Sequence, residues 1–202
     1  MLDSMLKIID KLIELARIGK KREKARLDEV FTPAFNEMQA VHADYLAMFT
    51  ELAIRIGKIP HGAGYADPVA RETVDFLAQR RLLQRPVREK LRVLQDLAFG
   101  DGFTEHEKAF LEVMDRYFFY ASVTSSRGTS LSMEILNQLK VALGMPLSAE
   151  DLEAGGGGLG LDGELERVVL QCQRRCGYLE DCWRRLAEAH AGLKLHVIAQ
   201  SA

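Results

Sequence analysis

The sequence predicts an all-α protein, a multi-helix bundle with long amphipathic helices toward both ends of the chain. Two apolar stripes carry this prediction, together with the lack of alternating strand patterns longer than a few residues. Residues of the first stripe recur at steps of three or four: Leu27, Val30, Ala34, Met38, Val41, Tyr45, Met48, Leu52 and Ile56. Residues of the second stripe have the same spacing: Leu165, Val169, Cys172, Cys176, Leu179, Trp183, Leu186, His190, Leu193 and Val197. Such spacing places side chains on one face of a helix, which must be buried against another helix.

The first 57 residues predict either one long helix or two helices. An amphipathic pattern that runs in register into the first stripe begins at Leu2, Leu6, Ile9, Ile13 and Ala16. Lys20 and Glu23 interrupt it, because charged residues there occupy apolar positions. Pro33 lacks a backbone N–H and crowds the preceding turn, so we expect a kink or a break there. Gly57 and the segment 60–64 then end this region.

Local signals predict the helices between residues 67 and 118. Asp67 is a good N-cap and Pro68 suits the first helical position. Pro86 predicts the start of the next helix for the same reason. Thr104 and Glu107 have the spacing of a capping box and therefore open a further helix.

The remaining elements follow from glycine positions. We expect a helix over residues 131–143, ended by Gly144, and a long C-terminal helix over residues 163–199. Gly177 and Gly192 lie inside that last helix and each costs ~1 kcal/mol relative to alanine, so we expect local bends. Four consecutive glycines at 155–158 predict a linker over residues 155–162. The domain organisation is then a bundle over residues 1–154, the linker, and a helix over residues 163–202 that packs on the same bundle.

Bulk composition excludes some classes of protein. The chain has 202 residues, 48% of them hydrophobic, and a net charge of -2. No charge-free run reaches the roughly 18 residues that a membrane-spanning helix needs, so we expect no membrane span. Three cysteines without a signal peptide predict reduced thiols and a cytoplasmic protein.

Two stretches are locally basic. Residues 17–26 and residues 80–92 each carry six basic residues against one glutamate. They could meet nucleic acid or another anionic partner, although no aromatic residues are interleaved for base stacking, and solvated helix faces are the alternative. A hydroxyl-rich loop around Arg127 precedes a helix N-terminus and could hold a phosphate, whereas ordinary capping by Thr129 or Ser130 is the alternative. The candidate anion-binding residues are Lys20, Lys21, Arg22, Arg85, Arg88 and Arg127.

Catalytic, cofactor and metal motifs give no positive prediction. Cys172 and Cys176 share a helix face, but Cys182 lies about 240° around the helix, so one helix cannot gather them around an ion. The Gly155-x-Gly157-x-x-Gly160 match to a dinucleotide fingerprint lacks the preceding strand. We therefore expect no cofactor, no metal and no catalytic constellation. His61, in a glycine-containing loop, is the most exposed histidine.

The stretch 97–107 resembles the Asp-Gly turn and following Glu of tellurite-resistance-type helical domains. The residues that carry the resemblance are Asp101, Gly102 and Glu107. No site is carried over from it, and Asp101 and Glu107 are the residues to test for a cation.

These observations favour a non-enzymatic helical interaction or scaffold module. The partner would be a second copy, giving a homo-oligomer with a coiled-coil-like seam, or another helical protein. The predicted contact residues are Met38, Tyr45, Met48, Leu52, Leu179, Trp183 and Leu186. Packing of the two long helices on each other within one chain stays open as an alternative. Nucleic-acid or phosphate binding through the basic stretches is the second functional hypothesis, and a small enzyme or metal protein using His61, Asp101 and Glu107 is the third.

Overall fold

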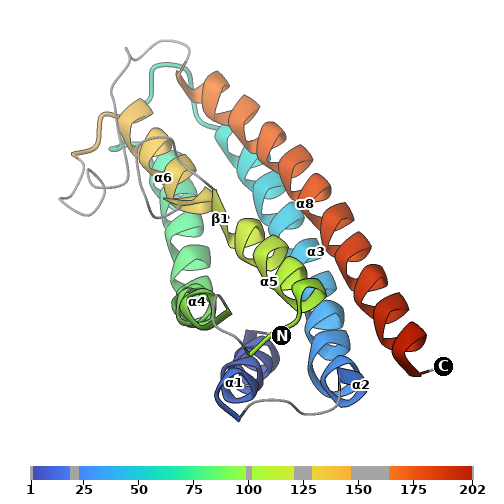
Figure 1. Cartoon of the computed structure of the whole chain (residues 1–202). Helices are drawn as coiled ribbons and strands as arrows, with labels where there is room; N and C mark the ends of the chain where they lie inside the picture. Colours follow the sequence, from blue (N-terminus) through green and yellow to red (C-terminus); the bar gives the residue numbers. More distant parts are fainter. Residues whose placement is uncertain (1, 19–22, 99–101, 121–128, 147–163, 202) are drawn as a thin grey trace. The chain divides into compact units, whose positions relative to one another are not determined.

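The protein is all-α, as the sequence predicts. The computed structural model in Figure 1 describes residues 2–18, 23–98, 102–120, 129–146 and 164–201. Its helices are α1 (Leu2–Ile18), α2 (Glu23–Arg26), the π-helix η1 (Leu27–Phe31), α3 (Thr32–Ile56), α4 (Pro68–Ala98), α5 (Glu105–Phe118), α6 (Leu131–Ala142) and α8 (Glu164–Ser201). Two short strands, β1 (Phe119–Tyr120) and β2 (Thr129–Ser130), pair antiparallel between α5 and α6.

The N-terminal region is not one continuous helix. Helix α1 contacts η1, whereas in a single helix the end of α1 and the start of η1 would lie ~14 Å apart. Ile9 and Leu12 of α1 are fully buried. Of the two arrangements that the sequence left open, the structure has separate helices.

The irregularity expected near Pro33 is a π-helical turn. The N–H of Thr32 donates to the carbonyl of Leu27, five residues back, and the α-helical pattern begins only at Thr32. Because Pro33 has no N–H, the chain loses a regular α-helical bond at this point in any case. The wider turn leaves Leu27, Val30 and Phe31 buried.

The two helix caps predicted from the sequence, at Asp67 and at Thr104, are present in the structure. The Asp67 carboxylate accepts hydrogen bonds from the N–H groups of Val69 (2.8 Å) and Ala70 (3.1 Å). Glu107 and Thr104 exchange the two bonds of a capping box, at 2.8 and 3.3 Å.

Helix α6 ends in a Schellman motif at Gly144. Gly144 has φ of 67°, its N–H donates to Val141, and the N–H of Met145 donates to Lys140. Glycine adopts this left-handed backbone without the steric cost that a side chain brings.

The prediction that a new helix starts at Pro86 is wrong. Helix α4 runs without interruption from Pro68 to Ala98, with Pro86 inside it. Pro86 and Leu82 are both exposed, so water can reach the Leu82 carbonyl that Pro86 cannot bond. Solvation of that carbonyl removes the main penalty for a proline within a helix.

The chain forms two compact units, and each contains segments that are distant in sequence. Unit 1 comprises residues 1–44, 84–118 and 179–202, and unit 2 comprises residues 45–83 and 119–178. Helices α3, α4 and α8 each contribute one part to unit 1 and another part to unit 2. The predicted linker, 155–162, lies outside the described residues, so the predicted domain boundaries stay predictions.

Each unit has its own apolar core. The core of unit 1 is built from α1, η1, the first part of α3, α5 and the second part of α8, with Phe31, Met38, Phe110, Tyr117 and Leu186 fully or almost fully buried. The core of unit 2 is built from the rest of α3, the first part of α4, α6 and the first part of α8. Its most deeply buried members include Phe49, Leu52, Leu77, Ile135 and Leu139.

Helix α8 closely matches the predicted C-terminal helix. It is continuous across Gly177 and Gly192, and a Cβ atom added at either glycine would meet nothing within 4 Å.

Candidate functional site

The residues predicted to contact a partner are core residues of the two units. Six of the seven have at most 3% of their surface exposed: Met38, Tyr45, Met48, Leu52, Leu179 and Leu186. The seventh, Trp183, is half-buried. A partner could reach the six buried side chains only if a unit opened, so surface that the chain leaves uncovered must be sought elsewhere.

Trp183 stands in a stack of four rings that joins α3 and α8 within unit 1. The Trp183 ring lies nearly parallel to the ring of His42 on one side, with centroids 5.1 Å apart, and to Phe35 on the other, at 5.0 Å. Phe35 in turn stacks on His190 at 4.3 Å. Offset parallel packing of this kind adds to the energy of burial. Trp183 therefore has a packing role within unit 1.

Both histidines of the stack are held in hydrogen bonds. His42 Nδ1 lies 2.8 Å from the Tyr117 hydroxyl, and His190 Nε2 lies 3.2 Å from the Thr32 hydroxyl. Burial lowers the pKa of His190 to about 4, with Lys194 acting in the same direction. Burial also lowers the pKa of His42, against the opposing charge of Glu180. Both rings are neutral at pH 7, and His190 is buried in the core of unit 1.

Glu107, a residue to test for a cation, binds an arginine of the same chain. Arg26 Nε lies 2.9 Å from Glu107 Oε1, and the two side chains are 4% and 1% exposed. A second donor, Arg26 Nη1, binds the Gly102 carbonyl at 3.0 Å. Burial raises the pKa of Glu107, while the bonds from Thr104 and the charge of Arg26 lower it. The carboxylate is committed to a buried ion pair and a helix cap, and Asp101 lies outside the described residues.

The basic stretches are partly neutralised where the structure describes them. Arg26 is buried, as above, and Arg85 pairs with Glu89 at 2.6 Å. Lys90 pairs with Asp10 of α1 at 2.5 Å, and the Arg80 guanidinium lies over the Phe76 ring. Lys20, Lys21, Arg22 and Arg127 lie outside the described residues, as does the side chain of Arg88. Of the basic residues that the structure describes here, Arg26, Arg85 and Lys90 are thus each paired with a carboxylate of the same chain.

Cys172, Cys176 and Cys182 form no disulfide, and Cys172 and Cys182 are buried. Burial raises the pKa of Cys172 to about 12, with the neighbouring Cys176 acting in the same direction. A thiol with so high a pKa is unreactive at neutral pH. Within the described part of the chain, no three His, Cys, Asp or Glu side chains are placed to hold a metal ion.

His61 lies at a pocket of unit 2. The pocket has a volume of about 680 Å³ and is lined by residues from the end of α3, the segment after it, the end of α6 and the start of α8. Sequence reasoning singled out His61 for its exposed loop but did not foresee the cavity, which joins segments more than 80 residues apart.

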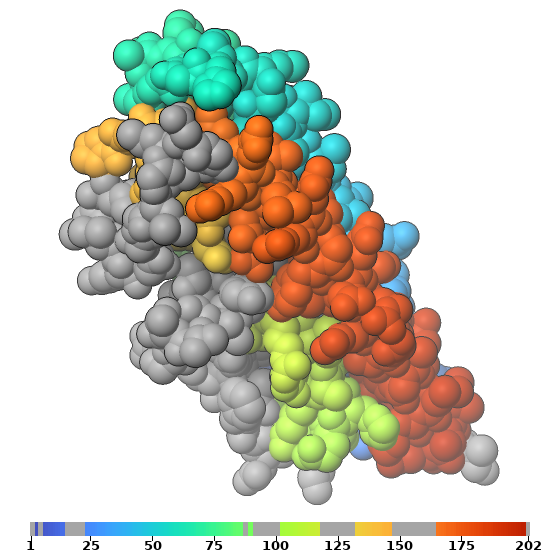
Figure 2. Space-filling model, turned by 90° about the horizontal axis from the view of Figure 1, so that it is seen from above, coloured from blue at the N-terminus to red at the C-terminus, as the bar shows by residue number. Residues whose placement is uncertain are grey.

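The last turns of α8 carry a second apolar face that the sequence analysis missed. Leu195 and Ile198 are 68% and 63% exposed, and Ala191 and Ala199 beside them are exposed as well. They recur at steps of three and four, on the side of the helix opposite the buried Leu193 and Val197. Figure 2 shows α8, from orange to red, with its outer side open to solvent. The three- and four-residue spacing of this face is present in the sequence, but it is much shorter than the stripe that runs along the opposite side of the same helix.

No helix in the described ranges is both long and apolar enough to cross a membrane. Comparison with known proteins adds no assignment: no family model, no curated protein and no solved structure matches the chain.

Proposed function

We propose that this protein is a non-enzymatic helical interaction module that binds a helix of another polypeptide, either a second copy or a different protein. The contact surface is the outer face at the end of α8, defined by Ala191, Leu195, Ile198 and Ala199. This proposal keeps the function that the sequence favoured but moves it from the buried stripes to uncovered surface.

The observation that carries the proposal is that the end of α8 is apolar on two opposite sides. One side packs into unit 1 through Leu193 and Val197, and the other leaves Leu195 and Ile198 in water. A helix that is apolar all round is typical of a buried helix. Covering a fully exposed leucine or isoleucine contributes about 1.5–3 kcal/mol, so a partner helix gains most of its binding energy from these two side chains.

The polar surroundings of this face suit a reversible contact. Glu188 lies 3.8 Å from Arg184, Lys194 is exposed, and Gln200 bonds to His196 at 3.1 Å. Charges of both signs around an apolar centre form the polar rim that protein interfaces have. Four residues cover only a small area, so we expect a transient complex.

Site-specific photo-crosslinking tests the proposal. A benzoylphenylalanine at position 195 is irradiated in cells that make the full chain, and the matched control carries the same group at position 170. Leu170 lies on the same helix and is 45% exposed, but it lies outside the proposed face. We expect an adduct from position 195 only. An adduct of twice the chain's mass identifies a second copy, and another mass identifies a different protein.

A double variant then links the adduct to the apolar face. Leu195→Glu with Ile198→Glu should abolish association in sedimentation velocity while circular dichroism stays unchanged, because both side chains point to solvent. Equal adducts from positions 195 and 170, or none from either, would contradict the proposal.

A further inference from the structure

The pocket of unit 2 has the size and lining of a small-molecule site. Its volume of about 680 Å³ lies within the ~300–1,000 Å³ that ligand pockets commonly have. Its apolar walls come from three helices and one connecting segment: Ile56, Ile59, Ala142, Leu143, Leu165 and Val169. Of these, Ile56, Ile59, Ala142 and Leu143 are buried, so the walls belong to the core of the unit.

The segment from Gly57 to Asp67 forms one side of the pocket and is held by its own backbone. The N–H of Ile59 donates to Ile56 and that of Ala63 to Pro60, both at 3.0 Å. The N–H of Tyr65 donates to the Leu143 carbonyl at 3.1 Å, which ties the segment to the end of α6. A wall fixed in this way costs little conformational entropy when a ligand binds.

Glycines keep the pocket open. Gly57, Gly62, Gly64 and Gly144 all line it. Gly62 and Gly144 have φ of 75° and 67°, a backbone that disfavours other residues, and a Cβ at either would meet nothing within 4 Å. The turns that the backbone requires therefore place residues without side chains along the lining.

The charge of the lining favours a cation over an anion. Among the lining residues that the structure describes, Glu166 in the first turns of α8 is the one with a formal negative charge, and none is lysine or arginine. The carboxyl ends of α3 and α6 also meet at the pocket and carry partial negative charge. The amino end of α8 carries the opposite partial charge, which the Glu166 carboxylate offsets.

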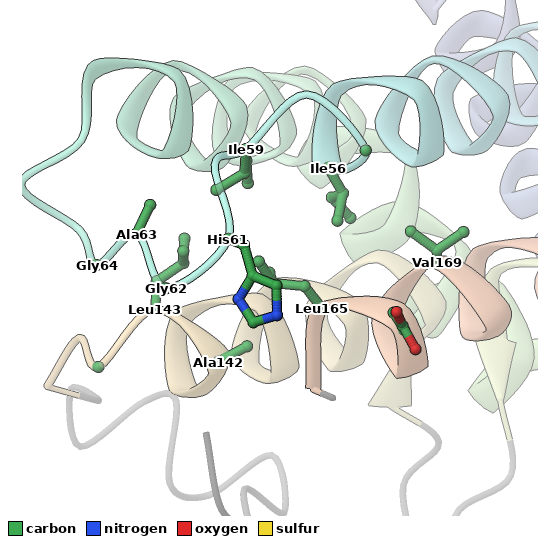
Figure 3. A pocket seen from close by; sticks show the side chains of 13 residues that line it. Ile56, Ile59, His61, Gly62, Ala63, Gly64, Ala142, Leu143, Leu165 and Val169 are labelled. Carbon is green, nitrogen blue, oxygen red and sulfur yellow. The ribbon is translucent and has the colours of Figure 1, made fainter. Parts of the chain in front are cut away.

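His61 supplies the second polar side chain. Figure 3 shows its imidazole ring pointing from the segment toward Ala142 and Leu165, into the pocket. An imidazole can accept or donate a hydrogen bond according to its tautomer, so it suits an amine or a hydroxyl on the ligand.

We propose that this pocket binds a small amphipathic amine, with its apolar body against the six wall residues and its ammonium group beside Glu166 and His61. The site lies wholly within unit 2 and is independent of the α8 face proposed above. Loss of one function therefore leaves the other intact.

Three probes with the same carbon skeleton test the charge preference: phenylbutylamine, phenylbutanol and phenylbutyrate. Binding to the full chain is titrated at millimolar concentrations by shifts of methyl signals from Ala63, Ala142, Leu143 and Val169. We expect the amine to bind about fivefold more tightly than the alcohol, because a partly exposed ion pair contributes up to about 1 kcal/mol, and the carboxylate to bind most weakly.

Two pairs of variants locate the site. Glu166→Gln should reduce the affinity for the amine to that for the alcohol, whereas Glu72→Gln, at an exposed position of α4 outside the lining, should leave the preference unchanged. Ala63→Trp should fill the pocket and abolish binding of all three probes, and Ala66→Trp, just outside it, should not. Equal affinities for amine and carboxylate, wild-type binding by Ala63→Trp, or no methyl shift with any probe would overturn the proposal.

Discussion

The two units share three helices but fill their interiors differently. In unit 1, η1, α3, α5 and α8 contribute large rings that stack or meet edge to face, including Phe31 against Phe110 at 5.6 Å and Phe35 against Trp183 at 5.0 Å. In unit 2, Ile56 at the end of α3 and Gly57 just after it line a pocket of about 680 Å³. Large rings therefore fill unit 1 along these helices, whereas small and aliphatic residues leave a pocket that opens to solvent in unit 2. Unit 1 should be the more sensitive to substitution.

The largest expected effect is the loss of the buried ion pair of unit 1. Glu107→Gln keeps an oxygen for the Thr104 cap but leaves Arg26 buried without a counter-charge, so we expect the free energy of unfolding to fall by about 3 kcal/mol. Glu105→Gln is the matched control, because Glu105 is exposed and pairs with Lys108 at 3.1 Å. It should cost less than about 0.5 kcal/mol. Urea denaturation of the two variants measures the difference, and equal losses would contradict the distinction.

Removal of the central ring of the stack should have the next largest effect. Trp183→Ala deletes contacts with His42 and Phe35 inside unit 1, and we expect a loss of about 2–3 kcal/mol and a lower Tm. Sedimentation should show the same mass as the wild type, since the ring packs within one chain. A variant that keeps its Tm but loses an oligomeric state would instead place Trp183 at an interface between chains.

Acid should destabilise unit 1 through His190 and His42, whose pKa values are lowered in the folded protein. The pKa of His190 is about 4 in the folded protein against an ordinary value of 6.5, so between these values the unfolded chain binds more protons. This contribution to the free energy of unfolding is complete above pH 6.5 and is lost as the pH falls toward 4. The lowered pKa of His42 also makes the folded protein less stable in acid. The raised pKa of Glu107 has the opposite effect, because the folded protein then binds the proton more readily than the unfolded chain.

Thermal unfolding across this pH range checks the effect. Trp183, the single tryptophan, reports on unit 1 by fluorescence. His190→Gln should flatten the pH dependence, and His61→Gln, at the exposed position in unit 2, should not. An unchanged profile for His190→Gln would show that other groups cause it.

The smallest expected effects compare glycines on α8 with the glycine that ends α6. Gly177→Ala in unit 2 and Gly192→Ala in unit 1 add a methyl group in open space on a helix, so each should stabilise by about 0.5–1 kcal/mol. Gly144→Ala should destabilise by about 1 kcal/mol, because its φ of 67° strains any side chain. Differential scanning calorimetry resolves the opposite signs, and a destabilising Gly192→Ala would reveal a close approach at that position.

Short-range signals in the sequence predicted the fold well. The Asp67 cap, the Thr104 and Glu107 box and the Gly144 stop depend on residues within a few positions of one another, so their geometry follows from local chemistry. The first apolar stripe also identified the buried face of α3, whereas in α8 the match is partial, because Leu165 and Trp183 are half-buried and Val168 is buried. The prediction of a helix start at Pro86 was wrong. The energetic cost of a proline inside a helix depends on whether water reaches the unbonded carbonyl, here that of Leu82, and only the packed structure determines this.

The candidate sites were harder to foresee because they depend on contacts distant in sequence. Nothing local places Thr32 beside His190, Arg26 beside Glu107, or His61 beside the start of α8. The apolar stripes also could not separate a core from an interface, because the same spacing of apolar residues occurs in both. Only the exposed fraction of each side chain separates the two cases.

The division of α8 between the units has a consequence for synthesis on the ribosome. Neither unit contains all its segments until α8 has been made, because residues 164–178 complete unit 2 and residues 179–201 complete unit 1. Domains usually fold as units while translation proceeds, and here unit 2 has all its segments before unit 1 does. The apolar faces of α1, α3 and α5 therefore lack part of their packing partner until residues 179–201 have been made.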